Sequence, residues 1–161
     1  MASSTVSIRI EPVTPQNRQD ITALQVAPGQ ENFVESPSQC LEEAAALDLW
    51  RPVGLYDGTR LIGFSMYGYF PSDKNAPKAA EGQVWLDRLL IDAACQGKGY
   101  GKAAVAALTD RLRQEYGCRR IYLSVYRENT VACRLYQQMG FCFTGEKDTK
   151  GELVMAKNLT E

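Results

Sequence analysis

The sequence contains no histidine among its 161 residues. Catalysis by a Ser-His-Asp or Cys-His arrangement is therefore excluded, and the commonest metal ligand is missing. We expect no metal site. Any acid–base chemistry has to use tyrosine, carboxylates, lysine, cysteine or water.

Other patterns are missing as well. No run of 18 apolar residues occurs, so no transmembrane helix is predicted. The first residues show neither the basic nor the apolar stretch of a secretory signal. The 5 cysteines form no CxxC pair and no zinc-type spacing, and an odd, scattered set fits reduced thiols. Together these absences predict a cytoplasmic protein.

An excess of charge of either sign is also missing, since the net charge is −1. Bulk electrostatics therefore predict binding to neither nucleic acid nor membrane. The distribution is uneven, however, because residues 19–50 contain acids and no base, whereas residues 96–134 are rich in bases. One segment suits a cation and the other an anion, although a solvated helical face would explain either.

Predicted strands and helices alternate along the chain. Strands are expected at residues 6–10, 53–56, 61–69, 84–91, 121–126, 141–143 and 153–156, with a hairpin turn at Asp57-Gly58 and a loop at 71–81. Four helices are expected: one at residues 14–26, one that begins at 36–38, one that follows the glycines at 97–101 and ends at Tyr116, and one after Asn129. In the last of these, Val131, Leu135 and Met139 predict a buried stripe. We predict one α/β (α+β) domain, residues 1–161, with a mixed sheet.

A glycine-rich turn between a predicted strand and a predicted helix is the most informative segment. Its residues are Gln96, Gly97, Lys98, Gly99, Tyr100 and Gly101. Alternating glycines let backbone N–H groups approach an anion, and the helix N-terminus adds further N–H groups and its dipole. Lys98 and Lys102 add two cations. The segment suits a pyrophosphate, with a ligand-free glycine turn as the alternative.

Two other phosphate-binding loops do not fit this turn. A P-loop needs glycine at position 96 and Ser or Thr at position 103, where the chain has Gln96 and Ala103. A dinucleotide fingerprint that starts at Gly97 needs a third glycine at position 102, where the chain has Lys102. Both loops are excluded.

The same turn resembles the acetyl-coenzyme A signature Q/R-x-x-G-x-G/A of the GNAT superfamily of N-acetyltransferases. A second family feature is a strand, an asparagine and a helix ending in Leu-Tyr-x-x-x-Gly-Phe, found here as residues 121–126, Asn129 and residues 135–141. The resemblance covers nearly the whole chain. It implies a single GNAT-type domain whose mixed central sheet has splayed middle strands and is flanked by helices.

The resemblance implies acetyl-coenzyme A as cosubstrate. Its pantetheine arm is expected along Leu89, Leu90 and Ile91, and its pyrophosphate on the amides of residues 96–101, near Lys102. Asn129 is expected to contact the cosubstrate or a bridging water. The resemblance places Tyr136 beside the thioester sulfur.

The chemistry of amine acetylation agrees with these roles. A Lys-like amine has a pKa of about 10.4 and must lose a proton before it attacks. Asp87, on the strand before the glycine turn, is the candidate base, and Tyr136 is the candidate acid for the leaving thiolate. A salt bridge with Arg88 is the alternative for Asp87, and core packing is the alternative for Tyr136.

The sequence says least about the amine that accepts the acetyl group. Segments at residues 33–36, 51–56, 63–68 and 84–88 resemble bacterial spermine/spermidine acetyltransferases. Polyamines need carboxylates and aromatic walls along a groove, for which the candidates are Glu35, Glu31, Glu42, Tyr67 and Trp85. The alternatives are a GNAT enzyme for another amine (a protein N-terminus, an amino acid or an aminoglycoside) or a non-catalytic acetyl-coenzyme A-binding module. A small-molecule amine is the expected partner, and the resemblance is compatible with a homodimer.

Overall fold

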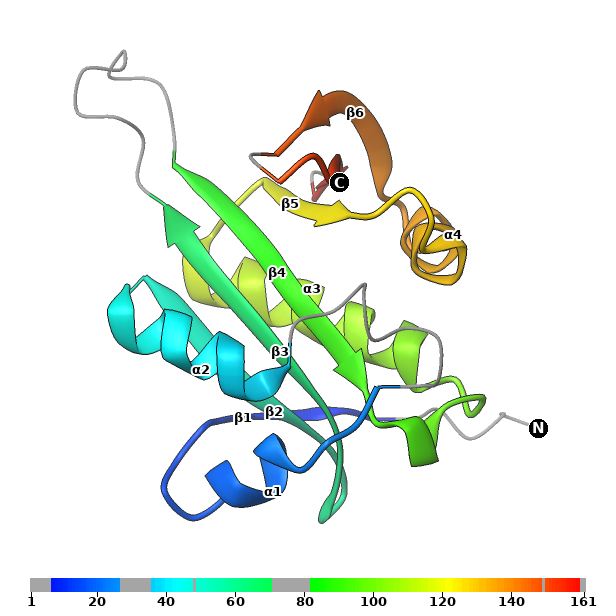
Figure 1. Ribbon diagram of the computed structural model, residues 1–161. Helices are drawn as coiled ribbons and strands as arrows, with labels where there is room; N and C mark the ends of the chain where they lie inside the picture. Colours follow the sequence, from blue (N-terminus) through cyan, green and yellow to red (C-terminus); the bar gives the residue numbers. More distant parts are fainter. Residues whose placement is uncertain (1–6, 27–35, 48, 71–81, 149, 160–161) are drawn as a thin grey trace.

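The computed structural model describes residues 7–26, 36–47, 49–70, 82–148 and 150–159 (Figure 1). Its strands are β1 (Arg9–Pro12), β2 (Trp50–Asp57), β3 (Arg60–Phe70), β4 (Gln83–Ile91), β5 (Arg120–Val125), β6 (Cys142–Lys147) and β7 (Leu153–Asn158). Its helices are α1 (Arg18–Thr22), α2 (Pro37–Ala46), the short 3-10 turn η1 (Ala93–Cys95), α3 (Tyr100–Tyr116) and α4 (Thr130–Gln138). The predicted α/β class is confirmed.

The strands form one mixed sheet in the order β1-β2-β3-β4-β5-β7-β6. Only β4 and β5 run parallel among the described neighbours. In the part of the chain that the structure describes, these two strands pair at Val84–Ile121 and Trp85–Tyr122 and nowhere further along. The predicted splay of the middle strands is therefore confirmed, and it opens the sheet next to the second half of β4.

Helices cover both faces of the sheet (Figure 1). On one face, α1 and α2 bury a small apolar cluster that contains Ile21, Leu41, Phe64 and Met66. On the other face, α3 packs its apolar stripe into the larger core, which also takes in Tyr136 of α4. Burial of these side chains, at about 25 cal/mol per Å² of apolar surface, is the main force that holds the helices to the sheet.

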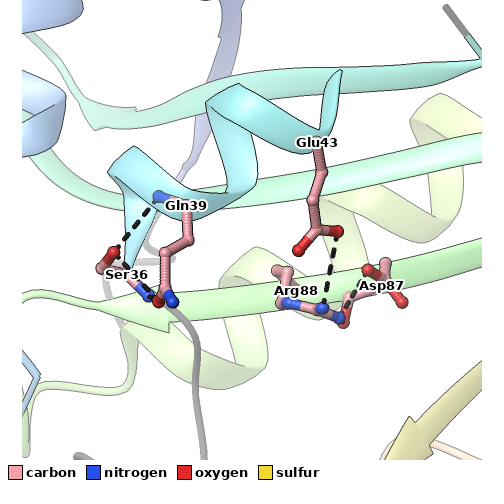
Figure 2. A network of polar contacts seen from close by, with 5 residues as sticks. All are labelled: Ser36, Gln39, Glu43, Asp87 and Arg88. Carbon is pink, nitrogen blue, oxygen red and sulfur yellow. Dashed lines mark hydrogen bonds and ion pairs between the residues drawn. The ribbon is translucent and has the colours of Figure 1, made fainter. Parts of the chain in front are cut away.

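The start of α2 shows why a helix forms there. Ser36 is the N-cap, and its side chain accepts a hydrogen bond from the backbone N–H of Gln39 at 3.2 Å. The Gln39 side chain in turn accepts from the backbone N–H of Ser36 at 3.1 Å (Figure 2). Pro37 occupies the first helical position, where its missing N–H costs nothing. The prediction of a helix from residues 36–38 is confirmed.

The helix α1 is shorter than predicted. The backbone N–H of Thr14 donates to the Asn17 side chain at 2.7 Å, which makes residues 14–17 a turn that precedes the helix. At its other end, the backbone of Gln25 bonds to Asp92 and Ala93 beyond β4, which draws the chain out of helical geometry. The first strand begins at Arg9 and thus runs later than the predicted 6–10, while the predicted loop at 71–81 lies outside the described residues.

The predicted buried stripe on α4 is wrong in one position. Val131 is 67% exposed, because this face of α4 borders a cavity and not a layer of the core. Gly140 has a φ of +97°, as expected for the residue after a helix end. None of the helices that the structure describes is long and apolar enough to cross a membrane.

Candidate active site

A cavity of about 380 Å³ lies between the end of β4, the start of α3 and the exposed face of α4. It is the place where the two sequence motifs meet. The predicted residues that line it are Leu89, Ile91, Gln96, Gly97, Gly99, Tyr100, Gly101, Lys102, Asn129 and Tyr136. Two segments far apart in the sequence are thereby brought to one site, as the cofactor prediction requires.

The glycine turn has a backbone that other residues adopt only with strain. Gly97 and Gly99 have φ values of +78° and +82°, in the left-handed region. Gly99 is the N-cap of α3, so no side chain covers the first N–H groups of that helix. Lys102 lines the same cavity. Open amides, the helix dipole and one cation together favour an anionic group here.

Two side chains hold the turn in place. Gln96 donates from Nε2 to the carbonyl oxygen of Ile91 at 3.0 Å, which ties the start of the turn to the end of β4. The Tyr100 hydroxyl donates to the Asp57 carboxylate at 2.6 Å, which ties the start of α3 to the β2–β3 hairpin. These two hydrogen bonds anchor the turn and the start of α3 to the neighbouring strands.

Two predicted cofactor contacts do not line the cavity. Leu90 lies on the opposite face of β4, in a groove shared with Ser36 and Gln39. Side chains alternate along a strand, so Leu90 cannot share a face with both Leu89 and Ile91. Lys98 is exposed and is absent from the cavity wall.

Tyr136 and Asn129 approach the cavity from α4. Tyr136 is 8% exposed, and its ring meets Phe141 edge to face at 5.8 Å between centroids. Burial raises the pKa of the Tyr136 hydroxyl above its usual range, so this group keeps its proton at neutral pH. Asn129 caps α4 by accepting from the backbone N–H of Ala132 at 3.3 Å.

A β-bulge at Asp87 decides which side chains face the cavity. Met66 of β3 pairs with Arg88, and Tyr67 pairs with Leu86, which leaves Asp87 as the extra residue on β4. Because a bulge puts two consecutive side chains on one side, Asp87 and Arg88 both face α2 (Figure 2). The alternation then resumes one step out of phase, which turns Leu89 and Ile91 toward the cavity.

Asp87 lies in a charged network under α2. Its carboxylate is 2.5 Å from Nη1 of Arg88, and Nη2 of Arg88 is 3.8 Å from the Glu43 carboxylate (Figure 2). Burial raises the pKa of Asp87 to about 7, and the negative charges of Glu43 and Glu152 add to the rise. The positive charge of Lys150 works against this rise. The Arg88 guanidinium at contact distance also favours the ionised form.

Sequence reasoning missed three acids of this network, namely Glu43, Asp148 and Glu152. The last two come from the β6–β7 hairpin, where the Asp148 side chain accepts from the backbone N–H groups of Lys150 at 2.9 Å and Glu152 at 2.8 Å. Their acidic character is visible in the sequence. Their proximity to Asp87 depends on the strand order, in which β7 follows β5, and no local pattern gives that order.

Trp85 lies on the same face as Asp87, two residues earlier on β4. Its ring stacks on Tyr122 of β5 at 5.3 Å between centroids. Both rings border a groove of about 460 Å³ that Glu146 and Asp148 also line. We call this the Trp85 groove; it is lined by Gln83, Trp85, Tyr122, Glu146, Lys147, Asp148 and Val154.

The structure places Tyr67 away from this network, contrary to its predicted role as an acceptor wall. Tyr67 is 2% exposed, and its hydroxyl donates to Glu115 of α3 at 2.8 Å. It lies in the core on the α3 face because it alternates along β3 with Met66, which faces α1 and α2.

Of the remaining acceptor candidates, only Glu42 falls within the described residues. Glu31 and Glu35 lie outside the described residues. Glu42 is exposed on α2, and its neighbour Glu43 is the residue that contacts Arg88. Within the described ranges, no group of His, Cys, Asp or Glu has an arrangement that would hold a metal ion.

Comparison with known proteins agrees with this geometry. Residues 18–141 match the acetyltransferase (GNAT) family. The chain is 47% identical over 154 residues to the spermine/spermidine N(1)-acetyltransferase of Bacillus subtilis, covering 96% of this chain and 100% of the relative. A mycothiol acetyltransferase of Geodermatophilus obscurus is 36% identical over 56% of this chain and 29% of its own length.

Solved structures share the fold. An acetyltransferase from Thermus thermophilus superposes with a TM-score of 0.70 at 23% identity, over 95% of this chain and 97% of the other. The spermidine N-acetyltransferase of Vibrio cholerae, solved with CoA and spermine, gives a TM-score of 0.70 at 17% identity, over 96% of this chain and 97% of the other. With both sequence motifs lining one cavity beside splayed strands, the chain belongs to the acetyltransferase (GNAT) family.

Proposed function

We propose that this enzyme transfers the acetyl group of acetyl-coenzyme A to a primary amine of a polyamine, spermidine or spermine. The observation that carries the proposal is the 47% identity to the Bacillus subtilis spermine/spermidine acetyltransferase over that relative's whole length. The match spans 96% of this chain and therefore includes the stretch around Asp87.

The residues of the cavity fit acetyl-coenzyme A. The left-handed backbone at Gly97 and Gly99, with the start of α3, suits a pyrophosphate. The apolar side chains of Leu89, Ile91 and Leu135 suit a pantetheine arm. When bound, the cosubstrate supplies an acetyl group activated as a thioester.

Asp87 and Tyr136 handle protons on the two sides of the reaction. The acceptor arrives as an ammonium, and Asp87 takes its proton directly or through one water. The nitrogen lone pair then forms the new bond to the acetyl carbon while the carbon–sulfur bond breaks, and the nitrogen releases its second proton to the departing sulfur or to water. Tyr136 holds its proton and donates a hydrogen bond to the leaving sulfur. Its raised pKa makes complete transfer to a thiolate uphill by about 1.4 kcal/mol per pKa unit of mismatch, so a hydrogen bond is its main contribution.

The Trp85 groove supports an acceptor with a second positive charge. Side chains two residues apart on a strand are separated by about 6.6 Å, which is the spacing expected from Trp85 to Asp87. Amines joined by three or four carbons are about 5–6 Å apart, from ordinary bond lengths. With one nitrogen at Asp87, the next nitrogen reaches the aromatic ring and the carboxylates of Glu146 and Asp148.

An acceptor panel in a coenzyme A release assay tests the proposal. We expect turnover with spermidine and spermine, weak turnover with n-butylamine, and none with an aminoglycoside or a peptide N-terminus. As a control, calorimetry measures whether the same protein sample binds acetyl-coenzyme A. Binding of acetyl-coenzyme A without turnover of either polyamine would reject the polyamine acceptor and leave the family assignment intact.

Other expectations stay predictions. We propose that residues 1–161 form one domain, that the enzyme works in the cytoplasm, and that its partner is a small-molecule amine and neither a nucleic acid nor a membrane. A homodimer is a further prediction, which light scattering of the purified protein tests.

A further inference from the structure

The ion pair between Asp87 and Arg88 conflicts with the proposed role of Asp87. A carboxylate in contact with a guanidinium at 2.5 Å is a poor proton acceptor and a poor partner for an incoming ammonium. The pair is also well covered, since the side chains of Arg88 and Asp87 are 11% and 14% exposed. For Asp87 to receive the acceptor, the guanidinium has to move to another anion.

Glu43 is in position to be that anion. Its carboxylate is 3.8 Å from Nη2 of Arg88, and its side chain is 37% exposed at the edge of the network (Figure 2). A displacement of about 1 Å brings that contact to the length of a charge-assisted hydrogen bond. Ser65 donates from its hydroxyl to the backbone carbonyl of Arg88 at 2.5 Å, which confines the movement to the side chain.

We propose that Glu43 is a positioning residue that draws the Arg88 guanidinium away from Asp87 when the acceptor binds. In the acceptor-free enzyme, Arg88 neutralises the buried Asp87. An arriving ammonium replaces the guanidinium on Asp87, and Arg88 completes its pair with Glu43. In this exchange one cation, the ammonium, replaces another, the guanidinium, so the number of charges in the network stays balanced. The buried Asp87 carboxylate is therefore never without a positively charged partner. A monovalent or polyvalent amine releases Arg88 by the same exchange.

A double-mutant cycle tests this inference, which rests on the proposed function. Glu43→Gln removes the receiving charge with little change of shape, so Arg88 stays on Asp87. We expect the KM for spermidine to rise about 3- to 5-fold, the change that follows loss of a partly exposed ion pair, with kcat changed less than about twofold. In an Arg88→Gln background, Glu43→Gln should have no further effect, because the competing guanidinium is gone.

The matched control is Glu42→Gln, which removes an exposed carboxylate from the neighbouring position of α2 and should leave KM unchanged. If Arg88→Gln does not fold, Arg88→Lys supplies the second background, because a compact ammonium does not span both carboxylates. Thermal unfolding of each variant reports folding.

Each outcome is decisive. An equal KM rise in both backgrounds would mean that Glu43 binds the polyamine directly, and no rise in either would mean that Arg88 never competes; both overturn the exchange while spermidine turnover stands. If the wild type does not turn over spermidine, the proposed function falls and the exchange falls with it.

Discussion

The Arg88 guanidinium lies against the carboxylate of its own sequence neighbour, Asp87, at 2.5 Å. Consecutive residues of a regular strand point to opposite faces of the sheet, so this contact exists only because of the bulge in β4. The bulge thus creates the charged network under α2.

Tyr136→Phe removes the hydroxyl and keeps the ring that packs on Phe141. We expect kcat to fall about 10- to 150-fold, as for loss of a charge-assisted hydrogen bond of about 1.5–3 kcal/mol to the leaving sulfur, with little change in acetyl-coenzyme A affinity. Steady-state kinetics and calorimetry measure the two quantities. An unchanged kcat would remove Tyr136 from the chemistry and leave it as a core residue.

Asp87→Asn should change the pH dependence of the reaction. Burial raises the pKa of Asp87 to about 7, so the base form is lost as the pH falls below 7 and kcat/KM should fall with it. In Asp87→Asn this step near pH 7 should be absent, and the largest relative loss should appear above pH 7, where the wild-type carboxylate is ionised. A variant profile parallel to that of the wild type would point to positioning and not to proton transfer.

Gly99→Ala tests the anion-binding turn. A Cβ at a φ of +82° is strained by about 1–2 kcal/mol, although nothing lies within 4 Å of it. We expect the backbone to shift and the Kd for acetyl-coenzyme A to rise about 10-fold, measured by calorimetry. Gly58→Ala is the matched control, since Gly58 has a φ of +62° in the hairpin turn between β2 and β3 and also has open space around it. The control should lose similar stability and keep its affinity for acetyl-coenzyme A. Equal losses of affinity in both variants would contradict an anion-binding role for the glycine turn.

Trp85→Ala tests the Trp85 groove. Loss of a cation–π contact of about 0.5–2 kcal/mol should raise the KM for spermidine about 2- to 30-fold and leave the KM for n-butylamine unchanged. Tyr69→Ala is the control, because Tyr69 stacks on Tyr116 of α3 and its loss removes a comparable ring contact elsewhere on the sheet. Equal effects on both amines would place Trp85 in a structural role.

Ser36→Ala tests the beginning of α2, which carries Glu43. Loss of the cap should lower the free energy of unfolding by about 1 kcal/mol in a chemical denaturation experiment. Ser38→Ala, on the exposed side of the first turn of α2, is the control and should have an effect within about 0.5 kcal/mol. If the two variants are equally stable, the capping box contributes nothing measurable.

Much of the cofactor site was predictable because its signals are local. Alternate glycines between a strand and a helix indicate an anion-binding turn, and Asn129 precedes an amphipathic helix that carries Tyr136. These patterns depend on backbone geometry within a few residues. The sequence therefore indicates the turn, the cap and the tyrosine without reference to the rest of the fold.

The acceptor side was predicted less well because its signals are not local. Tyr67 was assigned to the acceptor wall for its aromatic ring, and nothing local in the sequence shows that it packs into the core against α3. Leu90 was grouped with Leu89 and Ile91 by the resemblance, although alternation along a strand separates it from them. Asp148 and Glu152 join the network only because the β6–β7 hairpin returns beside β5. Val131 was expected in the core because periodicity reports an apolar face and not what covers that face.

Because of the bulge, the cavity proposed for the acetyl donor and the charged network proposed for the acceptor lie on opposite sides of a single strand. Leu89 and Ile91 face α4, while Trp85 and Asp87 face α2 and the β6–β7 hairpin. On this proposed assignment, we expect substitutions in α2 or in that hairpin to change which amine is accepted without altering the wall proposed for the acetyl donor. We therefore expect laboratory evolution of this scaffold to yield new acceptor specificities without loss of coenzyme A binding.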